Sequence, residues 1–401
     1  MRHDFGIYFV DTIHMCLVWL SRRKRILVCL LSMCVVARAQ QTANTGSVIG
    51  VVHLADTGKA AVGITVFLQP PATLKGPVID PKTREFIVRD EPHRGDFYAK
   101  VGPNGAFEIK NVKPGDYFVL TSAPGYISQD AYIFPGALAP RQTTGTLPAF
   151  VQKVHVTSGA ATSVDLRLQR GGSIEGTVRL SDGRPAHTGA QIANEVAVSV
   201  EVKRKGGFIR SGGAAHTDNF GHYHIEGLAP ASYVVFVALP GKMVPTSSGL
   251  QGSEGEIVYA SSTVRASQAR VVNVRGMENY DHVDIDIPIA GLHKVTGKVV
   301  TNTEAVMNNS AIVRLYPSGE PSLSRSTPLQ ADGSFSFDDV SDEEYTIAVD
   351  FHGESEMLGL TADKKGLRMK MKKAPYENVS QNIRVAGQDP PAVVLRTEST
   401  P

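Results

Sequence analysis

GAFEIKNVKPGDYFVLTSAPG, residues 105–125, decides the fold because it occurs three times in the chain. The other two copies, GHYHIEGLAPASYVVFVALPG and GSFSFDDVSDEEYTIAVDFHG, begin at Gly221 and Gly333. All three align without a gap, and a repeat in fixed register indicates tandem structural units. The shared positions are an opening glycine, two apolar residues two apart, a tyrosine and a closing glycine: Phe107/Tyr223/Phe335, Ile109/Ile225/Phe337, Tyr117/Tyr233/Tyr345 and Gly125/Gly241/Gly353.

Each copy reads as a turn, a strand, a loop and a second strand. In the first copy, Phe107 and Ile109 alternate with Glu108 and Lys110, so the strand has one buried and one wet face. The loop contains proline and glycine, which disfavour a central strand. The tyrosine after the loop resembles a tyrosine corner, with its ring inside and its hydroxyl on a backbone group.

The rest of the chain repeats around this segment. Strands with a central glycine precede each copy, at 47–53, 173–178 and 294–300, and short apolar strands follow at 164–168, 283–287 and 393–395. Turn signals separate the strands without an amphipathic helix. The sequence therefore predicts an all-β chain of three tandem Ig-like or prealbumin-like antiparallel β-sandwiches, over residues 40–170, 171–290 and 291–401.

Residues 1–39 have the character of an export signal. A basic run, Arg22–Arg25, precedes the apolar residues 26–36, and Ala37-Arg38-Ala39 supplies small residues at a cleavage site. Cleavage leaves Gln40 first and places the mature protein outside the cytoplasm, in the periplasm, on the outer surface or secreted. A retained anchor is the alternative, although the apolar run is shorter than the roughly 20 residues that span a bilayer.

Composition narrows the function further. The three cysteines, at positions 16, 29 and 34, lie in this leader together with the single tryptophan, so the mature chain forms no disulfide. The leader holds six of the 41 basic and two of the 39 acidic residues, which leaves 35 basic and 37 acidic residues. This charge balance argues against nucleic acid as a partner.

The strand with glycine, the G-x-[FY]-x-[IF] strand and the tyrosine strand ending in Pro124-Gly125 or Pro240-Gly241 resemble the carboxypeptidase regulatory-like domain. The resemblance implies a transthyretin-like sandwich related to carbohydrate-binding-like folds, and it covers nearly all of the mature chain. The third copy departs from it, because Asp342-Glu343-Glu344 and His352-Gly353 replace the two Pro-Gly positions. The resemblance implies no catalytic residues, since the zinc peptidase that accompanies this domain elsewhere is a separate domain.

The residues themselves do not predict an enzyme. No histidine is followed by glutamate three residues later, and HExxH and GxSxG motifs are absent. His216, Asp218, His222 and His224 form the best cluster, because His222 and His224 share one face of a strand. Their equivalents in the other copies are ordinary outward-facing residues, so a solvated face is favoured over a metal site. We expect no catalytic, metal or cofactor site, and a metal-dependent hydrolase is the least favoured function.

Two charged stretches receive similar interpretations. Asp338, Asp339 and residues 342–344 lack the spacing of a calcium loop and are predicted to be a charged loop. A basic stretch is interpreted as a solvated strand edge where lysines discourage strand addition; its members are Lys364, Lys365, Lys370, Lys372 and Lys373.

The prediction is a non-catalytic, exported binding module, with polysaccharide or another polymer as the first candidate ligand. Tyr126, Tyr132 and Tyr259 are candidate stacking groups for a sugar. The alternative is a structural spacer or adhesion protein with a cell-envelope partner at the outer membrane. The insertions that distinguish the copies, residues 70–92, 246–269 and 361–375, are the expected sites of recognition.

Overall fold

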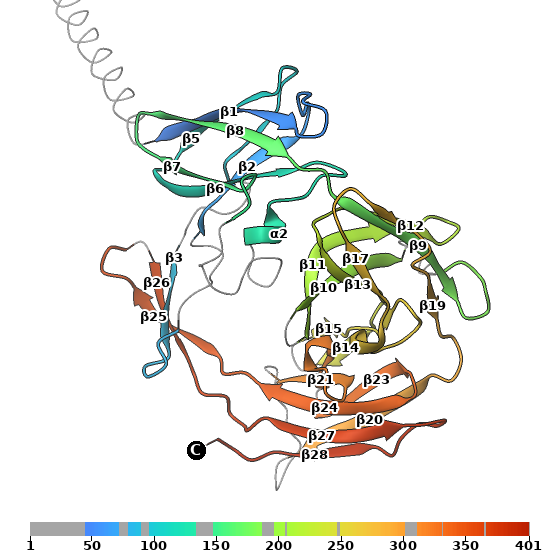
Figure 1. The fold of residues 1–401 in the computed structure, drawn as a ribbon. Helices are drawn as coiled ribbons and strands as arrows, with labels where there is room; N and C mark the ends of the chain where they lie inside the picture. The colour runs from blue at the N-terminus through green and yellow to red at the C-terminus, as the bar shows by residue number, and fades with distance from the viewer. Residues whose placement is uncertain are drawn as a thin grey trace, which may run out of the picture.

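Three pairs of facing β-sheets follow one another along the chain in the computed structural model (Figure 1). The structure describes residues 45–71, 79–89, 96–133, 147–186, 196–204, 207–246, 249–300, 311–330, 332–364 and 366–400. The predicted leader, with its cleavage site, lies outside these residues. None of the helices within them has the length and apolar character needed to cross a bilayer.

The first sandwich packs a three-stranded sheet, in the order β5-β1-β8, against a four-stranded sheet, in the order β4-β2-β6-β7. Its core lies between the two sheets. The predicted all-β sandwich is thus confirmed, with one added feature: β1 and β8, the first and last strands, pair in parallel. The strands are β1 (Gly46–Leu54), β2 (Thr65–Gln69), β4 (Tyr98–Lys100), β5 (Ala106–Val112), β6 (Gly115–Ser122), β7 (Gln152–Val156) and β8 (Ala161–Leu168).

The second sandwich repeats this plan. Its first sheet centres on β9, which pairs antiparallel with β12 and in parallel with β18 and β19. Its second sheet has the order β11-β10-β13-β16, with β17 also on β13. The strands are β9 (Gly172–Leu180), β10 (Ala197–Arg204), β11 (Gly207–His216), β12 (His222–Leu228), β13 (Ala231–Ala238), β16 (Ile257–Tyr259), β17 (Val271–Val274), β18 (Asn279–Tyr280) and β19 (Ile285–Ile287).

The third sandwich has the sheets β23-β20-β28 and β22-β21-β24-β27. Again the first strand pairs in parallel with the last, β20 with β28. The same topology therefore occurs three times. The strands are β20 (His293–Val300), β21 (Ala311–Pro317), β22 (Arg325–Pro328), β23 (Ser334–Val340), β24 (Glu343–Phe351), β27 (Val379–Val385) and β28 (Val393–Arg396).

The predicted inward positions are confirmed in all three copies. The paired apolar residues of β5, β12 and β23 and the following tyrosines are all buried. The first aromatic ring of each pair lies over the central glycine of the first strand, where an added Cβ would crowd the ring and collide with a carbonyl in or just before the last strand. Only glycine fits at this position, because the aromatic ring and the backbone of the parallel strand lie where a Cβ atom would be. The three pairs are Gly50 with Phe107, Gly176 with Tyr223 and Gly297 with Phe335.

A left-handed residue interrupts the same strand of each copy. Asn111, Gly227 and Asp339 have φ of 57°, 71° and 55°, and the pairing register with the first strand shifts beside each of them. Asn, Gly and Asp are the residue types that tolerate this conformation best. The repeat thus preserves a β-bulge that ends the pairing before the tyrosine strand begins.

Two of the predicted insertions pair with each other. β3 (Glu85–Arg89), from the first sandwich's insertion, lies beside β26 (Gly366–Met371), which follows β25 (Ser355–Leu360) near the third sandwich. Figure 1 shows β3 away from its own sandwich and against the orange strands. We call β25-β26-β3 the bridging sheet, because it connects the first and third sandwiches directly.

Candidate functional site

The histidine cluster does not converge on one point. His222 Nδ1 lies 3.4 Å from Asp218, whose other oxygen accepts the backbone N–H groups of Phe220 and His222. His224 Nδ1 instead lies 3.1 Å from Glu175 on the neighbouring strand, and both side chains are exposed. Among the described residues, no group of three or more His, Cys, Asp or Glu side chains is arranged to hold a metal ion. The geometry at these positions is that of separate ion pairs on a wet sheet face.

The acidic residues of the third copy also have separate partners. Asp338 binds Lys242, Asp342 lies 2.9 Å from His293, and Glu343 binds Arg265. These carboxylates therefore lie beside separate partners, Lys242, His293 and Arg265, instead of gathering around one centre.

The basic stretch corrects a prediction. Lys370 belongs to β26, the middle strand of the bridging sheet, so it does not lie at a strand edge. It stands opposite Glu85 on one side and Glu356 on the other. Lys365, of the same stretch, lies outside the described residues. The sequence could not show this pairing, because the strand that covers Lys370 comes from an insertion nearly 300 residues away.

The candidate stacking tyrosines are engaged inside the protein. Tyr259 is completely buried and donates its hydroxyl to Glu201 at 3.0 Å, so its assignment as a sugar-stacking group is wrong. Tyr132 is half-buried in an edge-to-face contact with Phe150. Tyr126 is half-buried, donates to Asp56 and lies under the guanidinium of Arg170.

The remaining insertion, residues 246–269, docks on the third sandwich. It continues the hairpin β14 (Met243–Thr246) and β15 (Gly249–Gly252) into β16 and the 3-10 helix η3 (Ala266–Gln268). Leu323, in the 3-10 helix η4 (Pro321–Leu323) of the third sandwich, completes an apolar cluster with Phe236 and Tyr259. Two sandwiches thus share one satellite core.

Arg265 fastens this contact electrostatically. Its guanidinium donates to both carboxylate oxygens of Glu343, at 2.8 and 3.1 Å, and to the carbonyl of Ser318 at 3.0 Å. Glu320 lies 3.5 Å away on a second side. The hydrogen bonds from Arg265 hold the pKa of the Glu343 carboxyl below its usual range. A partly buried bidentate ion pair of this kind also fixes the orientation of the second sandwich relative to the third.

Glu256 enters the third sandwich more deeply. Its Oε2 accepts the N–H and the hydroxyl of Ser341, at 3.1 and 2.9 Å, and its Oε1 accepts the hydroxyl of Tyr345 at 3.3 Å. Arg325, also buried, is the nearby cation. Burial raises the pKa of the Glu256 carboxyl, and Arg325 and Ser341 oppose that effect. A buried carboxylate that is matched this closely ties the two sandwiches together.

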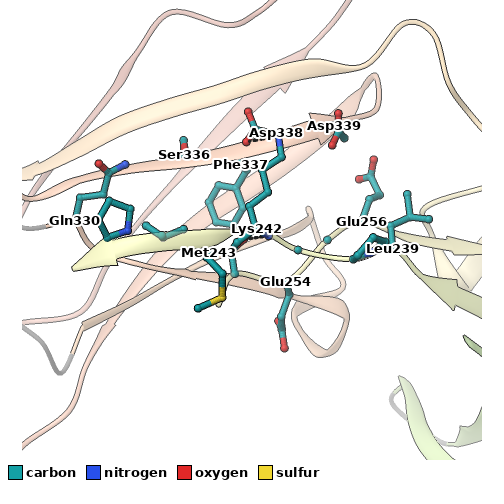
Figure 2. A pocket seen from close by; sticks show the side chains of 16 residues that line it. Leu239, Lys242, Met243, Glu254, Glu256, Gln330, Ser336, Phe337, Asp338 and Asp339 are labelled. Atoms are coloured by element: carbon teal, nitrogen blue, oxygen red, sulfur yellow. Dashed lines mark hydrogen bonds and ion pairs between the residues drawn. The ribbon is translucent and has the colours of Figure 1, made fainter. Parts of the chain in front are cut away.

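A pocket opens beside this contact, between residues 239–245 and 253–256 of the second sandwich and the β23 strand of the third (Figure 2). It encloses about 160 Å³. Lys242 crosses it to Asp338 at 3.0 Å, a pair drawn as a dashed line in Figure 2. Its wall mixes apolar and polar side chains, among them Leu239, Met243, Val244, Glu254, Gln330 and Ser336.

No protein-family model matches the chain, so the resemblance to the carboxypeptidase regulatory-like domain stays a prediction. No curated protein matches it in sequence either. The chain is similar to solved β-rich proteins. The Bacillus anthracis TIE protein aligns at 11% identity and TM-score 0.20 over 89% of this chain and 51% of its own, so this chain spans about half of that protein. A streptococcal ancillary pilin aligns at 11% identity and TM-score 0.23, over 88% of this chain and 99% of its own.

A Pseudomonas aeruginosa protein, for which carbohydrate binding has been proposed, aligns at 16% identity and TM-score 0.18 over 26% of this chain and 88% of its own. Scores this low do not superpose the three sandwiches as a whole. The assignment of the fold therefore rests on the sheet topology and the buried repeat described above.

Sequence reasoning missed Lys242, Glu256 and Arg265, residues of the second sandwich that bind the third. A signal was present: the third copy replaces Pro-Gly by Asp342-Glu343-Glu344 at the loop before its tyrosine. In the structure this loop is bound by Arg265 and Glu256 of the second sandwich. The partner segment could not be inferred without the tertiary contacts.

Proposed function

We propose that the mature protein is an exported, non-catalytic array of β-sandwiches that serves as a rigid structural or adhesion module of the cell envelope. The observation that carries this is the docking of residues 239–269 on the third sandwich through Lys242, Glu256 and Arg265. The insertion at residues 246–269, which was predicted to recognise a ligand, contacts the third sandwich instead. Together with the bridging sheet, these contacts connect the three sandwiches at more places than the linkers alone.

Rigidity is the property to test first. Small-angle X-ray scattering of purified residues 40–401 should give a narrow distribution of interatomic distances with a single maximum dimension, and the curve should not change with ionic strength. Flexibly linked domains would instead give a broad distribution of distances, which would contradict the proposal. Peptidase and glycosidase assays with and without zinc should show no turnover. A hydrolytic activity lost in the His222→Ala/His224→Ala variant would replace the proposal with an enzyme.

The partner is tested separately. Immobilised residues 40–401 should retain cell-envelope proteins or polymers from a detergent-solubilised whole-cell extract of the native organism, in preference to cytoplasmic proteins. Export itself is checked by the mass of the extracytoplasmic protein, which should begin at Gln40. A species that retains Arg22–Arg25 would indicate an anchor in place of a cleaved signal.

Polymer binding is a second candidate, favoured by the pocket of Figure 2. Its volume of about 160 Å³ is smaller than the roughly 300–1,000 Å³ of typical small-molecule sites, so it suits one sugar ring or chain end. Ser336→Trp should fill it and abolish polysaccharide retention, whereas Ser334→Trp, two residues along the same strand and outside the pocket, should not. Equal retention by both variants would remove this candidate.

A further inference from the structure

The bridging sheet differs from every other large sheet of the protein because it stands as a single layer. Each of the three sandwiches covers the apolar face of one sheet with a second sheet. In the described structure no second sheet pairs with or covers β25-β26-β3, and both of its faces carry exposed side chains. A sheet with one apolar face is stabilised by packing that face against another layer.

The pairing register divides this sheet into two chemically distinct faces. Met357 stands opposite Met369, which stands opposite Phe86, and Leu360 stands opposite Leu367, which stands opposite Val88. Since cross-strand neighbours project to the same side, these residues share one face. We call it the methionine face; its apolar members are Phe86, Val88, Met357, Leu360, Leu367, Met369 and Met371, and Ser355 lies on it opposite Met371.

The opposite face is charged and internally paired. Glu356, Lys370 and Glu85 stand in one cross-strand row, and Arg368 binds Glu85 at 2.9 Å. Lys372 lies 4.0 Å from Glu356. Ile87 is the apolar residue of β3 on this charged face and is 45% exposed, and Leu358, in the β25 bulge after Met357, is 39% exposed. The sheet is therefore amphipathic, and its charged face is the one suited to contact with water.

The methionine face is exposed to an extent unusual for such residues. Met357 is 64% exposed, Leu360 60%, Val88 44% and Leu367 38%. Together they present on the order of 400 Å² of apolar surface, within the range of patches that mark interaction sites. That is about half of the roughly 800 Å² that each partner contributes to a standard interface. A partner surface of similar shape, with some rim contacts, would complete a small interface.

We propose that the methionine face packs against the same face of a second copy of this chain, so that two bridging sheets form an intermolecular sandwich across a two-fold axis. An uncharged face meets an identical face without burying a charge. The turns at its ends carry both signs, Asp80 with Lys82 and Asp363 with Lys364, so a symmetry mate meets opposite charges at the rim. An anionic membrane or polymer would require a uniformly basic rim, and a second copy fits the mixed rim better.

This inference goes beyond the proposed function and does not depend on it. The test is sedimentation velocity of residues 40–401 at concentrations up to about 0.5 mM, because an interface of this size is expected to be weak. The weight-average mass should rise from one chain towards two. Met357→Lys/Leu360→Lys should raise the dissociation constant at least tenfold, because it buries two charges at the contact.

Ile87→Lys is the matched control, since it places the same charge on the opposite face of the same sheet. It should dimerise as the unmodified protein does. A monomer at every concentration, or dimerisation unchanged in the double variant, would overturn the proposal. Far-ultraviolet circular dichroism and melting temperature should be unchanged in all variants, because the substituted side chains are largely exposed.

Co-sedimentation with lipid vesicles tests the alternative that the methionine face binds a membrane. Phosphatidylglycerol and phosphatidylcholine vesicles should not co-sediment with the monomeric protein. Co-sedimentation that is lost on replacing Met357 and Leu360 by serine would assign the methionine face to a lipid surface and overturn self-association. Rigidity of the monomer, which the proposed function requires, is read from scattering and is unaffected by either result.

Discussion

The hydroxyl of Tyr345 in the third sandwich donates a hydrogen bond to Glu256 of the second, at 3.3 Å. The equivalent Tyr117 and Tyr233 donate instead to backbone carbonyls four residues upstream, at 2.9 and 2.8 Å, as the predicted tyrosine corner requires. In the third copy Ser341 occupies that upstream position and also binds Glu256. The carboxylate from one sandwich has thus replaced the internal corner of the next.

We expect Glu256→Ala to weaken the junction by about 3 kcal/mol, because it leaves two hydroxyls and an amide without their acceptor and removes the carboxylate near the buried Arg325. Tyr345→Phe should cost only about 1 kcal/mol, since it removes one neutral donor. Native-state hydrogen exchange of residues 341–351 measures both effects. Tyr233→Phe is the control, because it should loosen the second sandwich without changing exchange in the third. Equal exchange in all variants would show that Glu256 does not hold the junction.

The junction should also respond to pH in a defined direction. The pKa of Glu256 is raised in the folded protein above 4.5, so the folded state holds the proton more tightly. The stabilisation that this group contributes is then complete below its unfolded pKa and is lost as pH rises through the folded pKa. Glu256→Gln should therefore flatten the difference in melting temperature between about pH 4.5 and neutral pH. The groups that face Glu256 are Arg325, Ser341 and Tyr345, and burial raises the pKa of the Tyr345 hydroxyl further above this window. If the Glu256→Gln variant showed the same melting-temperature difference between the two pH values as the unmodified protein, Glu256 would not be the source of the pH response.

Arg265 and Glu343 should behave as a coupled pair. Arg265→Ala is expected to cost on the order of 3 kcal/mol at the junction, because Glu343 and Glu320 would remain there without a cation. Since the pKa of Glu343 is lowered in the folded protein, the stabilisation from this pair should be present above the unfolded pKa. It should be lost as pH falls through the folded pKa. A double-mutant cycle of Arg265→Ala with Glu343→Ala should give a coupling energy above about 1 kcal/mol. Additive effects would show that the pair does not connect the sandwiches.

Gly50→Ala should destabilise the first sandwich by about 1–3 kcal/mol, because the new methyl group would collide with the Phe107 ring and the Val164 carbonyl. Chemical denaturation followed by exchange of the β1 amides measures the change. Gly102→Ala is the matched control, since a methyl group there meets its neighbours at ordinary contact distance. Comparable effects of the two substitutions would refute the close-approach explanation.

The His222→Ala/His224→Ala variant should change stability by less than about 0.5 kcal/mol, because both histidines form exposed ion pairs. Zinc should not raise the melting temperature of either protein. A zinc-dependent rise of several degrees that the double variant loses would reveal a metal site at this hairpin.

Much of this protein could be derived from its sequence, because the information is local. The period-two pattern of Phe107 and Ile109 determines which face of the strand is buried, and the aligned Gly, Phe and Tyr positions repeat that determination three times. Features that depend on short-range pattern were therefore predictable.

The parallel pairing of the first and last strands, the bridging sheet and the Glu256 junction were decided only by tertiary structure. Each depends on groups far apart in sequence: β3 meets β26 across nearly 300 residues, and Glu256 meets Tyr345 across 89. The sequence around a residue in an insertion carries no periodic pattern from which its distant contact partner could be predicted. The same tyrosine, in the same repeat position, can satisfy its hydroxyl inside its own sandwich or on the next one, and only the folded arrangement of the units selects between them.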